Sequence, residues 1–93
     1  MGPQAKIILD FLITEPTHEM TRTKLLQKGY GDYDSVTLDR IVDQMFVEQG
    51  WIIKERIQEN KKGKIAWDWV YKMTPEAISQ YQEYKERENE EEV

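Results

Sequence analysis

The sequence contains no cysteine, and histidine occurs only once, at His18. The missing cysteine excludes disulfide bonds, thiolate catalysis and every zinc or iron–sulfur site built on cysteine ligands. A stable metal site usually needs three or four ligands, so a lone histidine between Thr17 and Glu19 predicts a solvated loop residue. A histidine–carboxylate metal pair is the alternative. We expect no metal and no cofactor.

Long apolar runs are also missing. The longest early cluster, IILDFLI over 7–13, is interrupted by Asp10 and is far shorter than the roughly 18 residues that suggest a membrane span. No positive n-region with a small-residue cleavage site is visible. We therefore expect a cytoplasmic protein, in the host cytoplasm if the chain is viral. Its 93 residues suit one domain with a single modest core.

The residue patterns of enzymes are absent as well. The chain has no cysteine nucleophile, no histidine dyad and no glycine-rich phosphate loop. Two acidic pairs remain, Asp32 with Asp34 and Asp39 with Asp43, and the second pair is typical of helix capping and surface charge. We expect neither catalysis nor a small-molecule substrate.

The charge is distributed unevenly along the chain. Of the formal net charge of −5, the segment 83–93 carries −4, from six acids and two bases, which leaves −1 for the other 82 residues. The overall acidity therefore says little about the partners of the body. We predict a folded domain over 1–85 and an acidic, disordered tail over 86–93.

The first helix is predicted over about 3–14. Pro3 suits a first helical turn, and apolar residues crowd 5–13 so densely that more than one side of this helix should be buried. Glu15-Pro16 ends it, because a residue before proline avoids the helical region.

A short second helix is predicted over 21–28. Thr21 can cap its N-terminus, and Gly29 is expected to end it in the left-handed conformation. The composition of 29–35 is that of a turn.

The third helix is predicted over about 35–49, with Asp34 or Ser35 as its cap and Gly50 at its end. Apolar residues at helical spacing define the face that should be buried. These are Leu38, Ile41, Val42 and Met45.

A β-hairpin and a last helix follow. The run 51–57 is rich in β-formers, and 65–73 alternates between two faces, with a flexible basic tip between them. Thr74-Pro75-Glu76 combines a cap, a first-turn proline and an acid near the positive helix end. The sequence thus predicts an α+β fold with a three-helix core, a hairpin and a C-terminal helix.

This order of elements resembles the winged helix-turn-helix family, especially small PadR- and MarR-type regulators and stand-alone winged-helix proteins of archaea and their viruses. SVTLDRIVDQMFVEQGWIIKE over 35–55 resembles a recognition helix leading into the wing. QENKKGK over 58–64 resembles the wing tip, and VYKMTPEAISQY over 70–81 the second wing strand with the final helix. The resemblance implies a transcription regulator that binds duplex DNA as a homodimer, with the third helix in the major groove and the wing on the backbone or minor groove.

The third helix has a polar face that could contact DNA. Arg40 can pair with a guanine edge or a phosphate, and Thr37 and Gln44 can hydrogen-bond to base edges. Val36 can contact a thymine methyl group, and Ser35 can contact a phosphate at the helix N-terminus. The alternative is a solvated helix face.

Asp43 fits this interpretation poorly, because a carboxylate repels phosphates. It could accept a hydrogen bond from a cytosine amino group or pair with Arg40 one turn away. Arg22, Thr23 and Lys24 begin the second helix, at the end that the resemblance places near the DNA backbone. Ordinary surface charge is the alternative for these three residues.

Four residues of the hairpin tip are candidates for phosphate or minor-groove contacts. They are Asn60, Lys61, Lys62 and Lys64. Clustered cations favour DNA binding because each neutralised phosphate releases a counterion. Alternatively, the lysines block pairing at a strand edge and aid solubility.

The three tryptophans Trp51, Trp67 and Trp69 permit two interpretations. Aromatic rings on a sheet can stack with the bases of single-stranded nucleic acid. A small domain can also bury a large area through alternating aromatic residues on one strand face. We predict the second, core packing, with some of this surface open to a contact between copies.

The first and last helices are the candidate dimer surface. Their contact residues are predicted to be Ile7, Phe11, Ile78, Tyr81 and Tyr84. Packing within the same domain is the alternative for this surface. The competing function is a winged-helix protein–protein interaction module that does not bind DNA, which the acidic balance and Asp43 favour.

Overall fold

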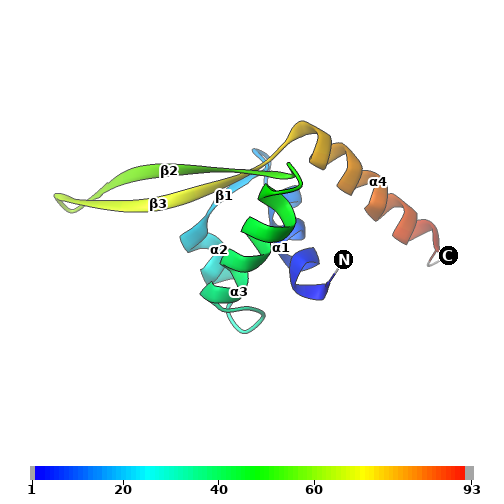
Figure 1. The fold of residues 1–93 in the computed structure, drawn as a ribbon, viewed down its shortest axis with the longest axis horizontal. Helices are drawn as coiled ribbons and strands as arrows, with labels where there is room; N and C mark the ends of the chain where they lie inside the picture. Colours follow the sequence, from blue (N-terminus) through cyan, green and yellow to red (C-terminus); the bar gives the residue numbers. More distant parts are fainter. Residues whose placement is uncertain (1, 92–93) are drawn as a thin grey trace.

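The computed structural model describes residues 2–91 and has an α+β fold (Figure 1). This confirms the α+β class of the predicted fold. Helices α1, α2 and α3 lie on one side of a three-stranded antiparallel sheet, and α4 leaves the end of β3 (Figure 1). The elements in chain order are α1 (Pro3–Thr14), β1 (Glu19–Thr21), α2 (Arg22–Lys28), α3 (Ser35–Arg40), the π-helical segment η1 (Ile41–Val47), β2 (Ile52–Lys61), β3 (Lys64–Met73) and α4 (Pro75–Glu91).

The sheet contains one strand that the sequence did not predict. The strands are ordered β1-β3-β2, and β1 pairs with the root of β3, where Met20 lies opposite Tyr71. Three residues are too short for a recognisable alternation, so this strand forms because the buried edge of β3 offers it hydrogen bonds. It anchors the segment between α1 and α2 to the sheet.

The hairpin of β2 and β3 is longer and tighter than predicted. Its strands extend to Lys61 and Lys64, which face each other across the two-residue loop Lys62-Gly63. Both loop residues have positive φ, 52° and 78°, as a type I′ turn requires. The loop between the strands is therefore shorter than the expected 58–64: only two of these residues lie outside the strands.

Side-chain caps begin the helices where the sequence indicated. The hydroxyl of Thr21 accepts from the Lys24 N–H, and the carboxylate of Asp34 accepts from the Thr37 N–H. The third cap, Thr74, accepts from the Ala77 N–H in the first turn of α4. Its hydroxyl also donates to the carbonyl oxygen of Gly50, just before β2. The last bond fastens α4 to the sheet.

Gly29 differs from its prediction. Its φ is −90°, so it does not adopt the left-handed conformation. A Cβ at this position would lie less than 3.0 Å from ring atoms of Tyr33, closer than real Cβ contacts. The glycine is needed because the Tyr33 ring packs directly on its backbone, where the phenol donates to the Leu25 carbonyl at 2.6 Å.

The third helix changes its winding halfway along. In η1 the N–H of Glu48 bonds to the Asp43 carbonyl, five residues earlier, instead of the usual four. This wider turn places Phe46 in the core and leaves Met45 only half-buried, which corrects the predicted core position. The helical segment ends at Val47, two residues before the predicted end, and Gly50, with φ of 75°, lies in the turn that follows.

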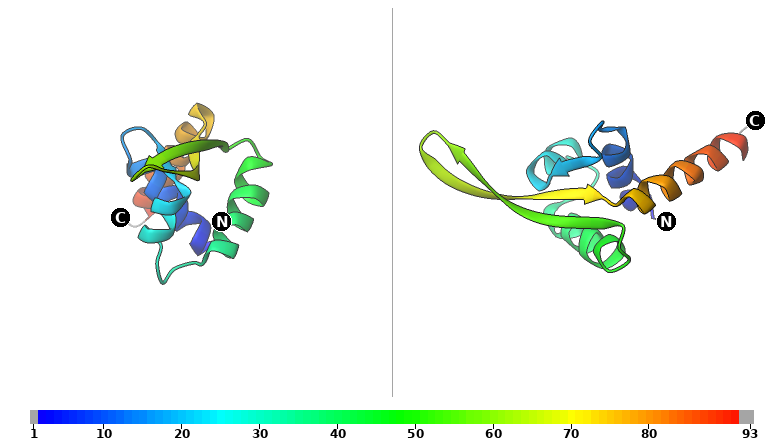
Figure 2. Two further views of the ribbon diagram at one scale, coloured as in Figure 1. Left: turned by 90° about the vertical axis from the view of Figure 1, so that its left-hand side faces the viewer. Right: turned by 90° about the horizontal axis from the view of Figure 1, so that it is seen from above.

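A single core lies between the helices and the root of the sheet. Its largest buried side chains come from α1, α2, α3, η1, both hairpin strands and α4. They are Ile8, Leu9, Leu12, Leu25, Leu38, Val42, Ile52, Tyr71 and Tyr81. The outer halves of the hairpin and of α4 reach beyond this core in opposite directions, so the molecule measures 53 × 28 × 24 Å (Figure 2).

The last helix extends into the segment predicted to be an acidic, disordered tail over 86–93. Helix α4 continues to Glu91, and 92–93 lie outside the described residues. Lys6 of α1 holds the carboxylate of Glu88 at 2.9 Å, which links the far part of α4 to the body. Among the described residues, no helix is both long and apolar enough to cross a membrane.

Candidate nucleic-acid interface

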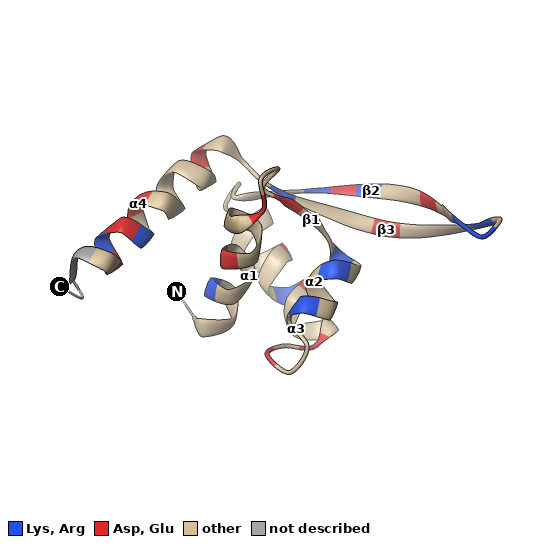
Figure 3. Ribbon diagram, turned by 180° about the vertical axis from the view of Figure 1, so that it is seen from behind, with Lys and Arg blue, Asp and Glu red and all other residues tan. Residues whose placement is uncertain are grey.

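Helix α3 with η1 and the root of the hairpin are neighbours in space. The N–H of Trp51, just before β2, donates to the Phe46 carbonyl of η1 at 2.8 Å. The ammonium of Lys54 on β2 lies 2.7 Å from the carboxylate of Asp43 on η1. Helices α2 and α3 lie beneath the inner part of the hairpin, and the tip extends past them (Figure 3).

The exposed side of the third helix contains the residues that the sequence assigned to DNA contact. Ser35, Val36, Arg40 and Gln44 are exposed, whereas Thr37 is half-buried. Arg40 has no ion-pair or hydrogen-bond partner among the residues that the structure describes. Its guanidinium group is therefore available for a partner outside the chain.

The N-terminus of α3 is already occupied by an acid. The N–H of Thr37 and its hydroxyl lower the pKa of the Asp34 carboxyl below its ordinary value. The capping carboxylate therefore stays charged and weakens the attraction of this helix end for phosphate. Ser35 lies next to that carboxylate, so a phosphate contact there would have to overcome repulsion.

Arg22 is engaged with a neighbouring helix. Its guanidinium group donates to both carboxylate oxygens of Asp39, at 2.8 and 3.0 Å, and this hydrogen bonding raises the pKa of Arg22. Lys24 lies 3.5 Å from the carboxylate of Glu15, and Thr23 is exposed. The start of α2 therefore faces solvent, but its two cations are accompanied by carboxylates.

Asp43 does not pair with Arg40, as the sequence had suggested. Its carboxylate binds Lys54 of the hairpin instead, because η1 turns it toward β2. The negative charge that looked unfavourable for DNA binding is thereby neutralised within the chain. The same ion pair fixes the hairpin root against the third helix.

The register of β2 and β3 divides the outer hairpin into two faces. Residues that pair directly lie on the same face of a strand pair. One face, which we call the aromatic face, consists of Lys54, Arg56, Gln58, Asn60, Ile65, Trp67 and Trp69. The other, which we call the charged face, carries Glu55, Glu59, Lys61, Lys64, Asp68 and Lys72.

The basic tip is shared between these faces and the turn. Asn60 lies on the aromatic face, Lys62 is in the turn, and Lys61 and Lys64 lie on the charged face. Lys61 is 3.2 Å from the Glu59 carboxylate. Figure 3 shows the cluster of cations at the tip and the separate cations on α2 and α3. The ribbon twists along its length, so its faces turn between root and tip (Figure 2).

The predicted core packing of the tryptophans is wrong for two of them. Trp67 and Trp69 remain 57% and 36% exposed, although they share a strand face with the buried Tyr71. The hairpin projects beyond the helices, so only its root is covered. Trp51, at that root, is half-buried against the core. The 23 positions from Trp51 to Met73, enough for two strands of ten residues joined by a short turn, were the sequence signal that could have indicated this projection.

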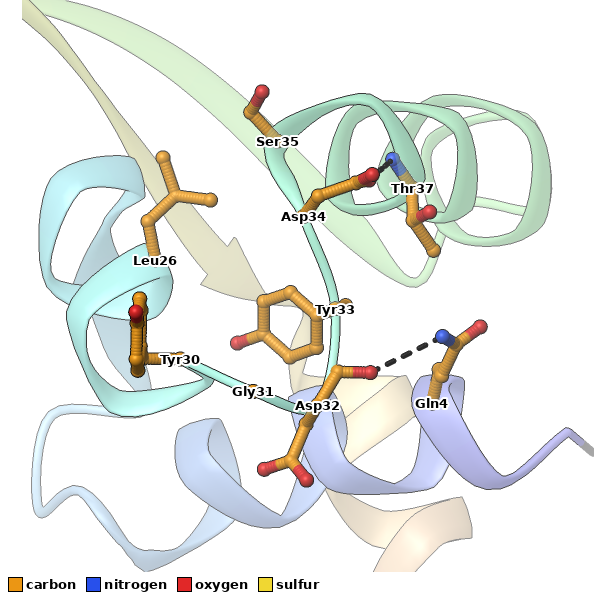
Figure 4. A pocket seen from close by; sticks show the side chains of 9 residues that line it. All are labelled: Gln4, Leu26, Tyr30, Gly31, Asp32, Tyr33, Asp34, Ser35 and Thr37. Atoms are coloured by element: carbon orange, nitrogen blue, oxygen red, sulfur yellow. Dashed lines mark hydrogen bonds between the residues drawn. The ribbon is translucent and has the colours of Figure 1, made fainter.

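A hollow of about 710 Å³ lies beside this region, between α2 and the starts of α1 and α3 (Figure 4). Tyr30 stands at its edge with 91% of its surface exposed, and Gln4 donates to the Asp32 carbonyl across it. The carboxylates of Asp32 and Asp34 lie at this hollow. Their negative charge makes it a poor place for phosphates.

Tyr81 does not belong to a surface between copies, as had been predicted. It is completely buried in its own chain, where its hydroxyl donates to the Asp10 carboxylate of α1. Burial and this hydrogen bond raise the pKa of the Tyr81 phenol. Lys85 also binds Asp10, at 3.0 Å. The contact of α4 with α1 is therefore an internal one.

The other four predicted contact residues are accessible to different degrees. Ile7, Phe11 and Ile78 are half-buried against the core, and Lys28 lies 5.6 Å from the centroid of the Phe11 ring. Tyr84 stacks on the neighbouring tyrosine of α4 and is 37% exposed. This surface is only modestly apolar.

His18 is not the solvated loop residue that was predicted. Its side chain is half-buried, with Nδ1 3.4 Å from the Leu12 carbonyl, and its own carbonyl accepts from the Met73 N–H. The described residues hold no group of three His, Cys, Asp or Glu side chains that could bind a metal ion.

Comparison with known proteins gives no relative: no family model, no curated protein and no solved structure matches the chain significantly.

Proposed function

We propose that the chain is a winged helix-turn-helix regulator that binds duplex DNA through α3–η1 and the hairpin. The proposal rests on the exposed, unpaired Arg40 side of the third helix beside a hairpin whose tip is cationic. The order of elements and the hairpin after the third helix support the winged-helix assignment. Arg40, with Gln44 and Val36, would enter the major groove, while the hairpin tip would contact the backbone or the minor groove.

The charge pattern agrees with this arrangement better than the net charge does. Two acids on the DNA-facing side, Asp39 and Asp43, are neutralised by Arg22 and Lys54. The acidic end of α4 projects to the opposite side from the hairpin (Figure 3). A polyanion approaching the hairpin and third helix would therefore meet the most cationic part of the molecule.

The test is duplex DNA binding measured by fluorescence anisotropy at several salt concentrations. About four phosphate contacts per subunit would give a slope of roughly −3.6 per subunit in the log–log plot of affinity against salt. Changing Lys61, Lys62 and Lys64 together to alanine should weaken binding to all sequences and flatten the slope. The Arg40→Ala change should weaken binding about 5- to 100-fold and relax sequence preference if Arg40 contacts a base.

A charge-matched control is available at the other end of the molecule. Replacing Lys6, Lys85 and Arg87 with alanine removes the same number of positive charges from the α1–α4 side. Because Lys6 and Lys85 bind Glu88 and Asp10, the comparison requires that this control keeps the Tm and the state of association of the wild type. If this control weakens DNA binding as much as the tip variant does, net charge and not the hairpin governs affinity. Absence of binding even at low salt would instead favour the protein–protein interaction module, to which the exposed Tyr30 and Val36 would then belong.

We further propose a homodimer through the α1–α4 surface that includes Ile7, Phe11, Ile78 and Tyr84. Two copies would double the phosphate contacts and place two third helices about 34 Å apart on one side of the DNA. Sedimentation of the protein without DNA tests this proposal, and a Phe11→Glu variant should be monomeric. A wild-type protein that remains monomeric at high concentration would contradict it.

A further inference from the structure

The aromatic face of the hairpin has a chemistry that duplex binding does not require. Three large apolar side chains are exposed on it: Ile65 by 65%, Trp67 by 57% and Trp69 by 36%. Exposed indole rings carry a hydration cost that a small protein usually avoids by burial. Their position at the outer half of the hairpin points to a ligand.

A cationic group lies over the ring of each of these two tryptophans. The guanidinium carbon of Arg56 lies 4.5 Å from the centroid of the Trp67 ring, and the ammonium of Lys54 lies 4.7 Å from that of Trp69. Such cation–π contacts hold the rings in place against the ribbon. More than half of Trp67 nevertheless remains open to solvent, so its ring can still stack with a planar partner.

No acid lies on the aromatic face of the hairpin. The acids of both strands, Glu55, Glu59 and Asp68, all belong to the charged face. The aromatic face therefore combines Arg56, two amides and exposed indoles with Lys54, whose charge is offset by Asp43 of η1. This combination suits a ligand that is both anionic and aromatic.

We propose that the aromatic face binds single-stranded nucleic acid, with unpaired bases stacked on Trp67 and Trp69 and the phosphates beside Arg56 and Lys62. Residues two apart on a strand are about 7 Å apart, so bases on the two rings would belong to an extended strand. Bases inside a duplex offer no free face for such stacking, whereas every unpaired base does. The inference goes beyond the proposed duplex binding and would hold for a chain that binds single strands alone.

A second copy of the chain is a poorer occupant of this face. Two aromatic faces brought together would place the Arg56 cations of both copies near one another, with no acid on either face to offset them. Lys54 has its carboxylate partner Asp43 on η1, off the hairpin. Charge complementarity thus favours a polyanion.

The experiment compares three labelled probes by anisotropy: an oligothymidine and an oligouridine of about 20 nucleotides, and a duplex of similar length. Wild-type protein should bind the single strands at low salt with quenching of its tryptophan emission. Trp67→Leu should weaken single-strand binding about 5- to 100-fold, whereas Trp67→Tyr, which keeps a stacking ring, should retain most of the affinity. The two single strands distinguish DNA from RNA as the source of the unpaired bases.

Controls separate this inference from duplex binding. Ile53→Ala, at an exposed apolar position on the charged face, should leave single-strand affinity unchanged. Arg40→Ala should weaken duplex binding more than single-strand binding. A wild-type protein that binds the single strands but not the duplex would overturn the proposed function and leave this inference standing.

Three results would overturn the inference. They are a wild-type protein without affinity for single strands at low salt, a Trp67→Leu variant as tight as the wild type, and a dimer without nucleic acid that dissociates in that variant. The last result would assign the aromatic face to a second copy of the chain.

Discussion

Replacing Gly29 with alanine should destabilise the protein through Tyr33 and not through backbone conformation. The φ of −90° is readily adopted by alanine, so no conformational strain is expected. The new methyl group, however, would overlap the Tyr33 ring, which is nearly buried and donates a hydrogen bond to Leu25. The ring would have to leave its position.

The magnitude follows from these two contacts. Overpacking of a core costs about 1–3 kcal/mol, and loss of the phenol hydrogen bond costs about 1 kcal/mol more. A loss of about 2–4 kcal/mol is a large part of the stability of a small domain. It corresponds to a fall in Tm of roughly 10–25 °C for a chain of this size.

A double-mutant cycle with urea unfolding tests the reasoning. In a Tyr33→Leu background the ring is gone, so Gly29→Ala should be neutral or stabilise by up to about 1 kcal/mol. Gly2→Ala is the matched control, because nothing lies near its Cβ position. Equal effects of Gly29→Ala with and without the Tyr33 ring would refute the steric explanation.

Three further predictions concern other parts of the molecule. Burial raises the pKa of Tyr33 and Tyr71 to about 12, so their neutral phenols stabilise the fold below pH 10, and up to about 2 kcal/mol each is lost as the pH rises to 12. Circular dichroism should show alkaline unfolding in this range, and a fold equally stable at pH 10 and 12 would contradict it. Thr74→Ala removes the hydrogen bonds of its hydroxyl and should cost about 1–2 kcal/mol in urea unfolding; a cost below 0.5 kcal/mol would show that the cap is dispensable. Asp39→Asn releases Arg22 and should tighten duplex binding several-fold at low salt, with no gain at high salt; an unchanged affinity would place Arg22 outside the interface.

Local signals in the sequence predicted the helices well. Thr21, Asp34 and Thr74 act as caps because a side-chain oxygen satisfies a nearby N–H, which depends only on adjacent residues. The alternation in 65–73 also correctly placed five side chains on one strand face. The alternation could not show how much of that strand face the helices bury, because this depends on where the helices lie along the hairpin. Tyr71 is therefore buried and Trp67 is exposed.

The candidate interface was less predictable than the helices. Its ion pairs, Arg22 with Asp39 and Lys54 with Asp43, join different elements that only the folded chain brings together. The shift from Met45 to Phe46 in the core arises from the five-residue hydrogen bonds of η1, which no periodicity of 3.6 residues can anticipate. Exposure of Arg40 was predicted correctly because it lies opposite the buried stripe in the regular part of the helix.

The two-residue turn at Lys62-Gly63 has a consequence for the order of folding. Strands joined by so short a link close within microseconds, because little chain entropy is lost. The bond between Tyr81 and Asp10 spans 71 positions, and Met20 of β1 pairs with Tyr71 of β3 across 51 positions. Such distant contacts form slowly. We expect the hairpin to close before β1 and α4 dock, so the part farthest from the core acquires its final shape first.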